Sequence, residues 1–345
     1  INLAWEHQVN QSQPEILQYG MQKGDARLRN ELANFLGQAY DAEVDPGALQ
    51  ITGGVSQALD LICTLLTRPG DTIIVEEPTY FLALRIFKDH HLNIVGTPND
   101  ENCLVIPALE ERVRKYNPKL VYTIPVYHNP TGITLAVERR DALARLSAAY
   151  DFMIVADEVY QLLSYNNTPP PPMTFFDENE NVISLGSFSK IMAPGLRLGW
   201  MHAHQKLLEP FWMCGLFDSG GGPNPLNAGI VSSAIKLGFQ QETLHHFQNI
   251  YRNRRDVLAR ALNEHLPQLT FTLPQGGFFI WSALEGGMDA EKVLVRAARH
   301  DVGFQPGVRF SSMDGLNSFL RLCFAYYGDD DLEEGVVRLS RAIEK

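Results

Sequence analysis

The chain has 345 residues, a formal net charge of −11 at pH 7 and 45% hydrophobic residues. This length and apolar content suit one large α/β domain with a smaller partner. The acidic balance and the lack of a basic face argue against binding to nucleic acid. No apolar run reaches membrane-spanning length, so no membrane partner is expected. The four cysteines form no C-x-x-C pair and no signal peptide opens the chain, so we expect reduced thiols, no metal site and a cytoplasmic location.

The elements predicted along the chain begin with a helix at 25–40, in which Leu28, Leu32 and Phe35 share one face. Seven short apolar or β-branched segments follow, separated by helical patterns, at 49–52, 72–77, 92–98, 120–126, 152–156, 182–185 and 198–203. Strands that alternate with helices predict a mainly parallel seven-stranded sheet with helices on both faces. Ligands of such α/β sheets bind at the carboxyl ends of the strands.

The pattern changes from about residue 267 to short strands, with helices near 289–300 and 330–343. This change predicts a smaller α+β domain at the C-terminus. We therefore expect a large domain at 17–255, and a small domain at 256–345 that also includes residues 1–16.

The segment Ser187-Phe188-Ser189-Lys190 follows an apolar strand, and Arg197 lies in a Pro-Gly loop soon after it. A partly desolvated amine has a lowered pKa and can act as a nucleophile. Ser187, Ser189 and Arg197 supply the hydroxyl donors and the guanidinium group that bind a phosphate. The alternative interpretation is that Lys190 is an ordinary solvated surface residue. Its position directly after a buried strand disfavours this interpretation.

Asp157 directly follows the apolar segment 152–156. A carboxylate at the end of a buried strand needs a partner. One possible partner is the pyridinium N–H of a cofactor, and this pairing would keep the cofactor ring able to accept electrons. The alternative partner is an arginine with a purely structural role. Tyr160 lies three residues on and can offer its phenol to an oxygen of the same ring.

Two turns that contain glycine, at residues 52–56 and 129–132, follow predicted strands. Asn129-Pro130-Thr131-Gly132 is a good turn in any protein, although the Asn129 amide can also donate to a ring oxygen. In Thr52-Gly53-Gly54-Val55-Ser56, glycine lets backbone N–H groups approach a phosphate at a helix N-terminus. Each turn alone is weak evidence.

Arg321 lies within the apolar segment 319–324, so its guanidinium group needs an anion. A substrate α-carboxylate suits its two-pronged geometry. A buried structural ion pair is the competing interpretation.

Taken in order, these motifs resemble the fold-type I enzymes that use pyridoxal 5′-phosphate (PLP). The similarity is greatest to class I/II aminotransferases, within the branch of 2-aminoadipate aminotransferases and MocR-type effector domains. It spans about Leu17 to Lys345. The motifs that carry it are Gly53-Gly54-x-Ser56, Glu77-Pro78-Thr79-Tyr80, Asn129-Pro130-Thr131-Gly132, Asp157-Glu158-Val159-Tyr160, Ser187-x-Ser189-Lys190, Arg197 and Arg321.

The resemblance implies a role for each matching residue. Lys190 forms the Schiff base with PLP and moves the proton, Asp157 binds the pyridine nitrogen, and Tyr160 and Asn129 bind the ring oxygen. Tyr80 stacks on the ring. The phosphate is held by Gly54, Val55, Ser56, Ser187, Ser189 and Arg197, and the substrate α-carboxylate by Arg321 with Asn129.

Tyr19 matches a family tyrosine that reaches the phosphate site of the neighbouring subunit, so the resemblance implies a homodimer with shared active sites. Residues 2–7 stand where the family has an arm that lines the substrate site. The activity implied is PLP-dependent transfer of an amino group from an L-amino acid to a 2-oxo acid. A β-lyase or decarboxylase on the same fold, and a non-catalytic PLP-binding sensor domain, remain as alternatives.

Overall fold

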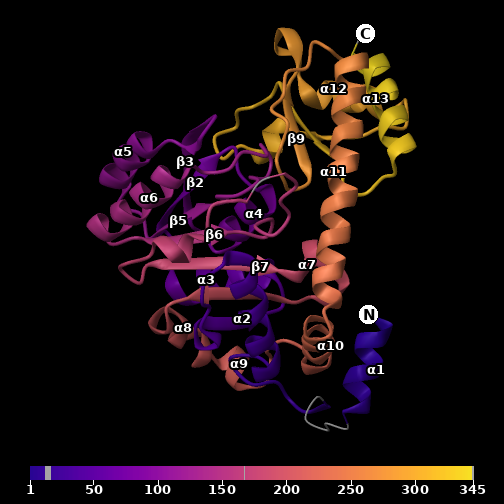
Figure 1. Cartoon of the computed structure of the whole chain (residues 1–345). Helices are drawn as coiled ribbons and strands as arrows, with labels where there is room; N and C mark the ends of the chain where they lie inside the picture. The colour runs from indigo at the N-terminus through magenta and orange to yellow at the C-terminus, as the bar shows by residue number, and fades with distance from the viewer. Residues whose placement is uncertain (12–16, 167, 344–345) are drawn as a thin grey trace.

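The fold is described from a computed structural model that covers residues 1–11, 17–166 and 168–343 (Figure 1). Its large sheet has the strand order β1-β8-β7-β6-β5-β2-β3-β4. The strands are β1 (Leu49–Thr52), β2 (Thr72–Glu77), β3 (Asn93–Asp100), β4 (Cys103–Leu104), β5 (Leu120–Thr123), β6 (Met153–Asp157), β7 (Val182–Ser187) and β8 (Gly199–Ala203).

The neighbouring pairs among β2, β3, β5, β6 and β7 are parallel, whereas β8 runs antiparallel to both β7 and β1. The predicted mainly parallel sheet is therefore confirmed. The additional strand is β4, which has two residues and pairs antiparallel with β3. A strand this short leaves no alternating pattern in the sequence.

Helices cover both faces of the large sheet. Ile73 and Val75 of β2 pack with α3 (Val55–Leu66) and α4 (Phe81–Asp89). Ile74 points the other way and packs with α5 (Ile106–Tyr116) and α6 (Val137–Tyr150), because successive side chains of a strand alternate between faces. The other helices of this part are α2 (Ala26–Tyr40), α7 (Phe188–Ile191), α8 (Gln205–Trp212), α9 (Gly215–Asp218) and α10 (Pro225–Lys236).

The smaller part contains an antiparallel sheet with the order β10-β11-β9. It is formed by β9 (Phe279–Ala283), β10 (Gln305–Pro306) and β11 (Phe319–Cys323), with α12 (Ala290–Ala298) and α13 (Asp329–Ile343) beside it. The long helix α11 (Phe239–His265) runs from one part to the other (Figure 1). Its residues Val257, Leu258 and Leu262 belong to the small-domain core. A boundary near residue 255 remains our proposal, because α11 is continuous there.

Helix α1 (Asn2–Asn10) lies against α10, at the opposite end of the molecule from the small domain (Figure 1). Ala4 packs with Ile230 and Ala234, and the Ser233 hydroxyl lies 3.0 Å from His7 Nδ1. These residues were expected to belong with the small domain, and residues 2–7 to lie near the substrate site; in this chain α1 contacts α10. None of the helices in the described ranges is long and apolar enough to cross a membrane.

Candidate active site

The carboxyl ends of β1, β2, β5, β6 and β7 lie along one edge of the large sheet, because these strands point in the same direction. A cavity of about 340 Å³ opens at this edge. It brings together most of the residues selected from the sequence. Those that line it are Val55, Ser56, Tyr80, Asn129, Asp157, Tyr160, Ser187, Ser189, Lys190, Arg197 and Arg321.

Lys190 lies in the single-turn helix α7, directly after β7. The Ser187 hydroxyl caps this turn by accepting from the Ser189 N–H at 3.1 Å. Burial lowers the pKa of the Lys190 amine, Arg321 and Arg197 add to this effect, and Asp157 opposes it. A lysine with a lowered pKa has a neutral fraction that can form a covalent bond to a carbonyl carbon.

Asp157 is the last residue of β6 and is 4% exposed. Its Oδ2 accepts a hydrogen bond of 2.8 Å from the Tyr122 hydroxyl, whereas its Oδ1 has no partner within the described part of the chain. Burial raises the pKa of Asp157 to about 6, and the Tyr122 hydrogen bond opposes that rise. A buried acceptor without a donor is costly, and the protonated ring nitrogen of PLP is a donor that fits this position.

The residues predicted to bind the phosphate converge where β1, β7 and β8 meet. Gly54 has φ +97°, a conformation that favours glycine, and a Cβ there would lie 3.0 Å from the Arg197 guanidinium group. Arg197 donates to the Gly53 carbonyl at 3.1 Å. The N–H groups of Val55 and Ser56 open the 12-residue helix α3, and the dipole of a helix favours an anion there. Gly54 therefore lies beside the cavity rather than lining it.

Arg321 lies in β11 of the small domain, and its guanidinium group packs on aromatic rings. Its Cζ is 3.8 Å from the centroid of Phe279 and 4.9 Å from that of Phe310. Burial lowers its pKa, and the groups that oppose this are phenols and a thiol rather than a carboxylate. Its Nε has no partner among the described residues. This guanidinium group is therefore placed to bind an anion that enters the cavity.

Asn129 joins the two domains, since its Oδ1 accepts from Arg321 Nη1 at 2.7 Å. Tyr160 is buried edge-on against Phe278, with ring centroids 5.2 Å apart, and burial raises its pKa. Tyr80 caps the N-terminus of α4, and burial raises the pKa of its phenol as well. Both phenols therefore stay protonated near neutral pH, and that of Tyr160 can donate to a ring oxygen.

Tyr19 is the selected residue that this chain does not bring to the cavity. Its side chain is 85% exposed and lies against Gly220, where an added Cβ would come within 2.6 Å of the ring. It is not among the residues that line the Lys190 cavity. Within one chain, Tyr19 is thus a surface residue.

Sequence reasoning missed three residues that shape the site. Tyr122 orients Asp157, and Phe279 and Phe310 flank Arg321. Phe279 and Tyr122 were read only as strand residues. Their apolar surroundings gave no sign that they faced a polar group from another strand.

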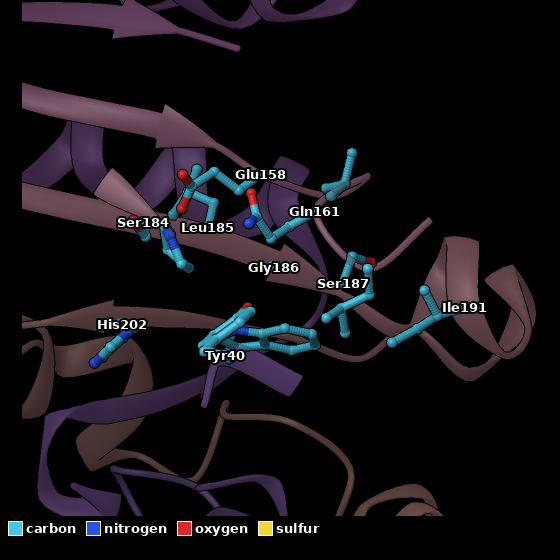
Figure 2. Close-up of a pocket in the computed structure, with 13 residues that line it drawn as sticks. Tyr40, Glu158, Gln161, Ser184, Leu185, Gly186, Ser187, Ile191 and His202 are labelled. Carbon is cyan, nitrogen blue, oxygen red and sulfur yellow. The ribbon is translucent and has the colours of Figure 1, made fainter. Parts of the chain in front are cut away.

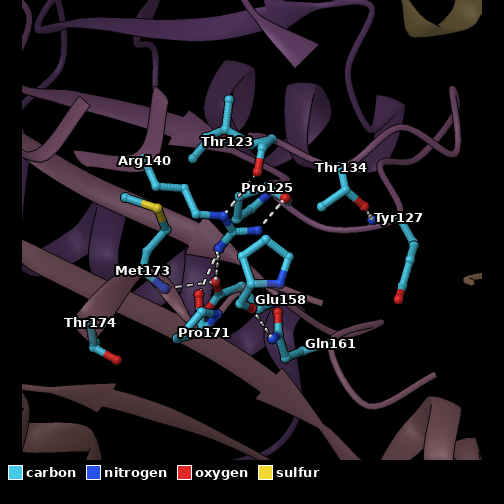
Figure 3. Close-up of polar contacts among 12 residues, drawn as sticks. Thr123, Pro125, Tyr127, Thr134, Arg140, Glu158, Gln161, Pro171, Met173 and Thr174 are labelled. Carbon is cyan, nitrogen blue, oxygen red and sulfur yellow. Dashed lines mark hydrogen bonds and ion pairs between the residues drawn. The ribbon is translucent and has the colours of Figure 1, made fainter. Parts of the chain in front are cut away.

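Next to Asp157 in sequence, Glu158 lies close to a buried arginine that anchors the proline-rich segment 169–172 to the sheet (Figure 3). Arg140 is fully buried and donates to the carbonyls of Pro125 at 2.5 Å and Pro171 at 2.9 Å. It also lies 3.6 Å from Glu158 Oε1, which accepts from the Met173 N–H at 2.9 Å. This arrangement satisfies the buried guanidinium group and holds the chain that follows Asp157, so the carboxylate of Glu158 is structural.

A second cavity lies beside β7 and contains Tyr40, Glu158, Gln161 and His202 (Figure 2). Burial lowers the pKa of His202 to about 4 and raises that of Tyr40. Both groups are neutral at physiological pH, and no lysine or arginine lines this cavity in the described ranges. It lacks the nucleophile and the anion-binding groups that the Lys190 cavity combines.

Comparison with known proteins identifies the family of this chain. The family model for aminotransferase class I and II matches residues 3–339. The chain is 35% identical over 341 residues to aromatic-amino-acid aminotransferase 1 of Thermococcus litoralis, covering 96% of this chain and 81% of that protein. It is 31% identical over 336 residues to the 2-aminoadipate transaminase of Thermus thermophilus, covering 95% and 82%.

The crystal structure of Pyrococcus horikoshii kynurenine aminotransferase in complex with PMP matches with a TM-score of 0.92 and 32% identity, covering 99% of this chain and 87% of that one. The resemblance seen in the sequence is confirmed, as are the α/β fold and PLP as the cofactor. The chain therefore belongs to the class I and II aminotransferase family and is a PLP-dependent transaminase.

Proposed function

We propose that the cavity at the carboxyl edge of the large sheet is where this transaminase moves the amino group of an L-amino acid to a 2-oxo acid. One observation carries the proposal. A buried lysine, a carboxylate oxygen without a donor and an arginine without an acidic partner face the same cavity. These are the groups needed to bond an aldehyde, pair with a pyridine N–H and hold an α-carboxylate.

Each of these residues has a separate role in the proposed reaction. PLP supplies a ring that accepts the electron pair left at the substrate Cα when the proton departs. Arg321 binds the α-carboxylate, which fixes the amino acid relative to Lys190. The neutral Lys190 Nζ is the base that removes the Cα proton, and it would then deliver that proton to the cofactor carbon. Asp157 Oδ1 would accept from the ring N–H, and Tyr160 and Asn129 would bind the ring oxygen.

Substrate preference follows from the charges in the cavity. The cationic side chains that line it, among the described residues, are Lys190, Arg197 and Arg321. All three have roles with the cofactor or the α-carboxylate, which leaves none for a second carboxylate. Phe81, Leu82 and Phe279 line the same cavity. We infer that amino acids with aromatic or other apolar side chains are preferred, as the name of the Thermococcus litoralis relative also suggests.

The proposed function also includes a second copy of this chain. Tyr19 is exposed and lies outside its own cavity, which is consistent with a role at the phosphate of a second copy. We infer a homodimer with shared sites. The four cysteines are free thiols, which supports a reducing, cytoplasmic location.

A half-reaction screen tests this function. The holoenzyme is mixed with one L-amino acid at a time, and conversion of the cofactor to its amine form is followed by absorbance. L-phenylalanine and L-tyrosine are expected to convert it at lower concentrations than L-aspartate or L-glutamate. Release of carbon dioxide, or elimination products without the amine form, would show a decarboxylase or lyase instead.

A further inference from the structure

The turn that carries Tyr80 also binds a loop of the small domain. Glu77 ends β2, and its carboxylate accepts from three donors of two consecutive residues. Its Oε2 accepts from the Ser312 N–H at 2.7 Å and from the Ser312 hydroxyl at 2.7 Å, and its Oε1 accepts from the Ser311 hydroxyl. Two residues on, the Thr79 N–H donates to the carbonyl of Phe310 at 2.9 Å.

Glu77 has no lysine or arginine partner within the described residues; its partners are neutral donors. A carboxylate that binds three neutral donors fixes their directions without forming an ion pair. The Ser311 hydroxyl in turn accepts from the N–H groups of Met313 at 3.1 Å and Gly315 at 2.8 Å. The loop is thus organised around the carboxylate of a residue from the other domain.

The same loop supports Arg321. The 3-10 helix Gly307–Phe310 ends in the fully buried Phe310. The ring of Phe310 lies 4.9 Å from Arg321 Cζ and packs edge-on against Trp281 at 5.6 Å. It also packs edge-on against Phe81 of α4, with ring centroids 5.2 Å apart. Phe81 follows Tyr80 directly, so Phe310 fills the space between the cofactor-facing turn and the substrate-binding arginine.

We propose that Glu77 is a positioning residue that fixes Arg321 relative to Tyr80 and thereby sets the affinity for the substrate α-carboxylate. The inference rests on the proposed role of Arg321. The Thr79 N–H binds the carbonyl of Phe310, and Glu77 binds the two residues that follow Phe310. The ring of Phe310 in turn packs against the guanidinium group of Arg321. Arg321 then binds a carboxylate without first being ordered, and preorganisation of this kind increases affinity.

The test compares Glu77→Gln with Glu111→Gln, which removes the same charge from an exposed position on α5. Glutamine keeps the size of the side chain but presents an N–H₂ group to one of the three donors. We expect the half-saturating concentration of L-phenylalanine in the half-reaction to rise about tenfold, as loss of hydrogen bonds to a charged group predicts. The limiting rate and the affinity for PLP should change by less than about twofold. Glu111→Gln should leave all three unchanged.

Arg321→Leu makes the test specific. If Glu77 acts through Arg321, Glu77→Gln should add less than about twofold to the half-saturating concentration in the Arg321→Leu background, because effects of coupled residues do not multiply. A full tenfold addition, or a loss that falls on PLP affinity or on the limiting rate, would overturn the inference. If Arg321→Leu itself has no effect, the proposed role of Arg321 fails. If it has a large effect and Glu77→Gln has none, only the role of Glu77 fails.

Hydrogen exchange gives a second measurement that needs no catalysis. The N–H groups of Ser312, Met313 and Gly315 should exchange faster in Glu77→Gln than in wild type, in apoprotein and holoenzyme alike, and remain unchanged in Glu111→Gln. Ser312→Ala removes one hydroxyl donor and keeps the carboxylate, so it covers the case in which Glu77→Gln folds poorly. It should raise the half-saturating concentration about threefold. Unchanged exchange together with unchanged saturation in Ser312→Ala would contradict the proposal.

Discussion

The Tyr122 hydroxyl donates a 2.8 Å hydrogen bond to Oδ2 of Asp157, a residue that lines the Lys190 cavity and whose Oδ1 has no partner among the described residues. Both groups are buried, so the bond fixes the carboxylate in one orientation. Tyr122→Phe keeps the ring and removes the donor. We expect the limiting rate of the half-reaction to fall about tenfold, because a buried hydrogen bond to a charged group is lost, while the protein still folds and binds PLP. An unchanged rate would show that Asp157 does not need this orientation.

Asp157 should make the stability of the apoprotein depend on pH. Its pKa is raised from 3.8 to about 6 in the folded apoprotein, so the folded state holds the proton more tightly than the unfolded state. The stabilisation is present below about pH 4 and is lost as the pH rises through about 6, a change of about 3 kcal/mol. Asp157→Asn removes this dependence. Its stability relative to wild-type apoprotein should therefore increase between pH 4 and pH 7.

Denaturant unfolding of the two apoproteins across this pH range checks that prediction. Asp89→Asn, at an exposed position on α4, serves as the control and should show a constant difference from wild type. A difference between Asp157→Asn and wild type that is also constant with pH would contradict the raised pKa.

Tyr19 should link cofactor retention to assembly, because a ligand that binds only the assembled form stabilises that form. Tyr19→Phe is expected to loosen PLP while Lys190 still bonds it, and Tyr116→Phe, on the surface of α5, should not. Mixing Tyr19→Phe with Lys190→Ala subunits gives a sharper result. In a dimer with shared sites, each mixed dimer has one site with both changes and one with neither, so activity should return. If the mixture is no more active than its Tyr19→Phe component, Tyr19 does not complete a neighbour's site.

The sequence was sufficient for the elements with strong local patterns. Alternating strands and helices predicted the sheet, and the position of Asp157 and Lys190 after apolar strands predicted a shared edge. Contacts that depend on register could not be predicted. Tyr122 faces Asp157 because β5 and β6 pair with Tyr122 opposite Val155, and nothing in either segment specifies that pairing.

Contacts between the large and small domains also could not be predicted, because local sequence patterns do not show how two domains pack together. Glu77 and Ser312 are 235 residues apart, and their contact follows from how the small domain packs on the large one. The contact between α1 and α10 could not be predicted for a similar reason. The buried Ala4 and Gln8 of α1 give no amphipathic pattern strong enough to show that they pack on α10.

The attachment of the cofactor to Lys190 is the central claim, and reductive trapping tests it most directly. Borohydride reduction of the holoenzyme makes the bond between PLP and its lysine permanent, and peptide mapping then locates the label. We predict that the label lies on the peptide that contains Lys190. Lys190→Ala should carry no label and show no turnover, while still binding some PLP through the phosphate-binding residues. A label on another lysine, such as the exposed Lys115 or Lys206, or transamination by Lys190→Ala at the wild-type rate, would contradict the account.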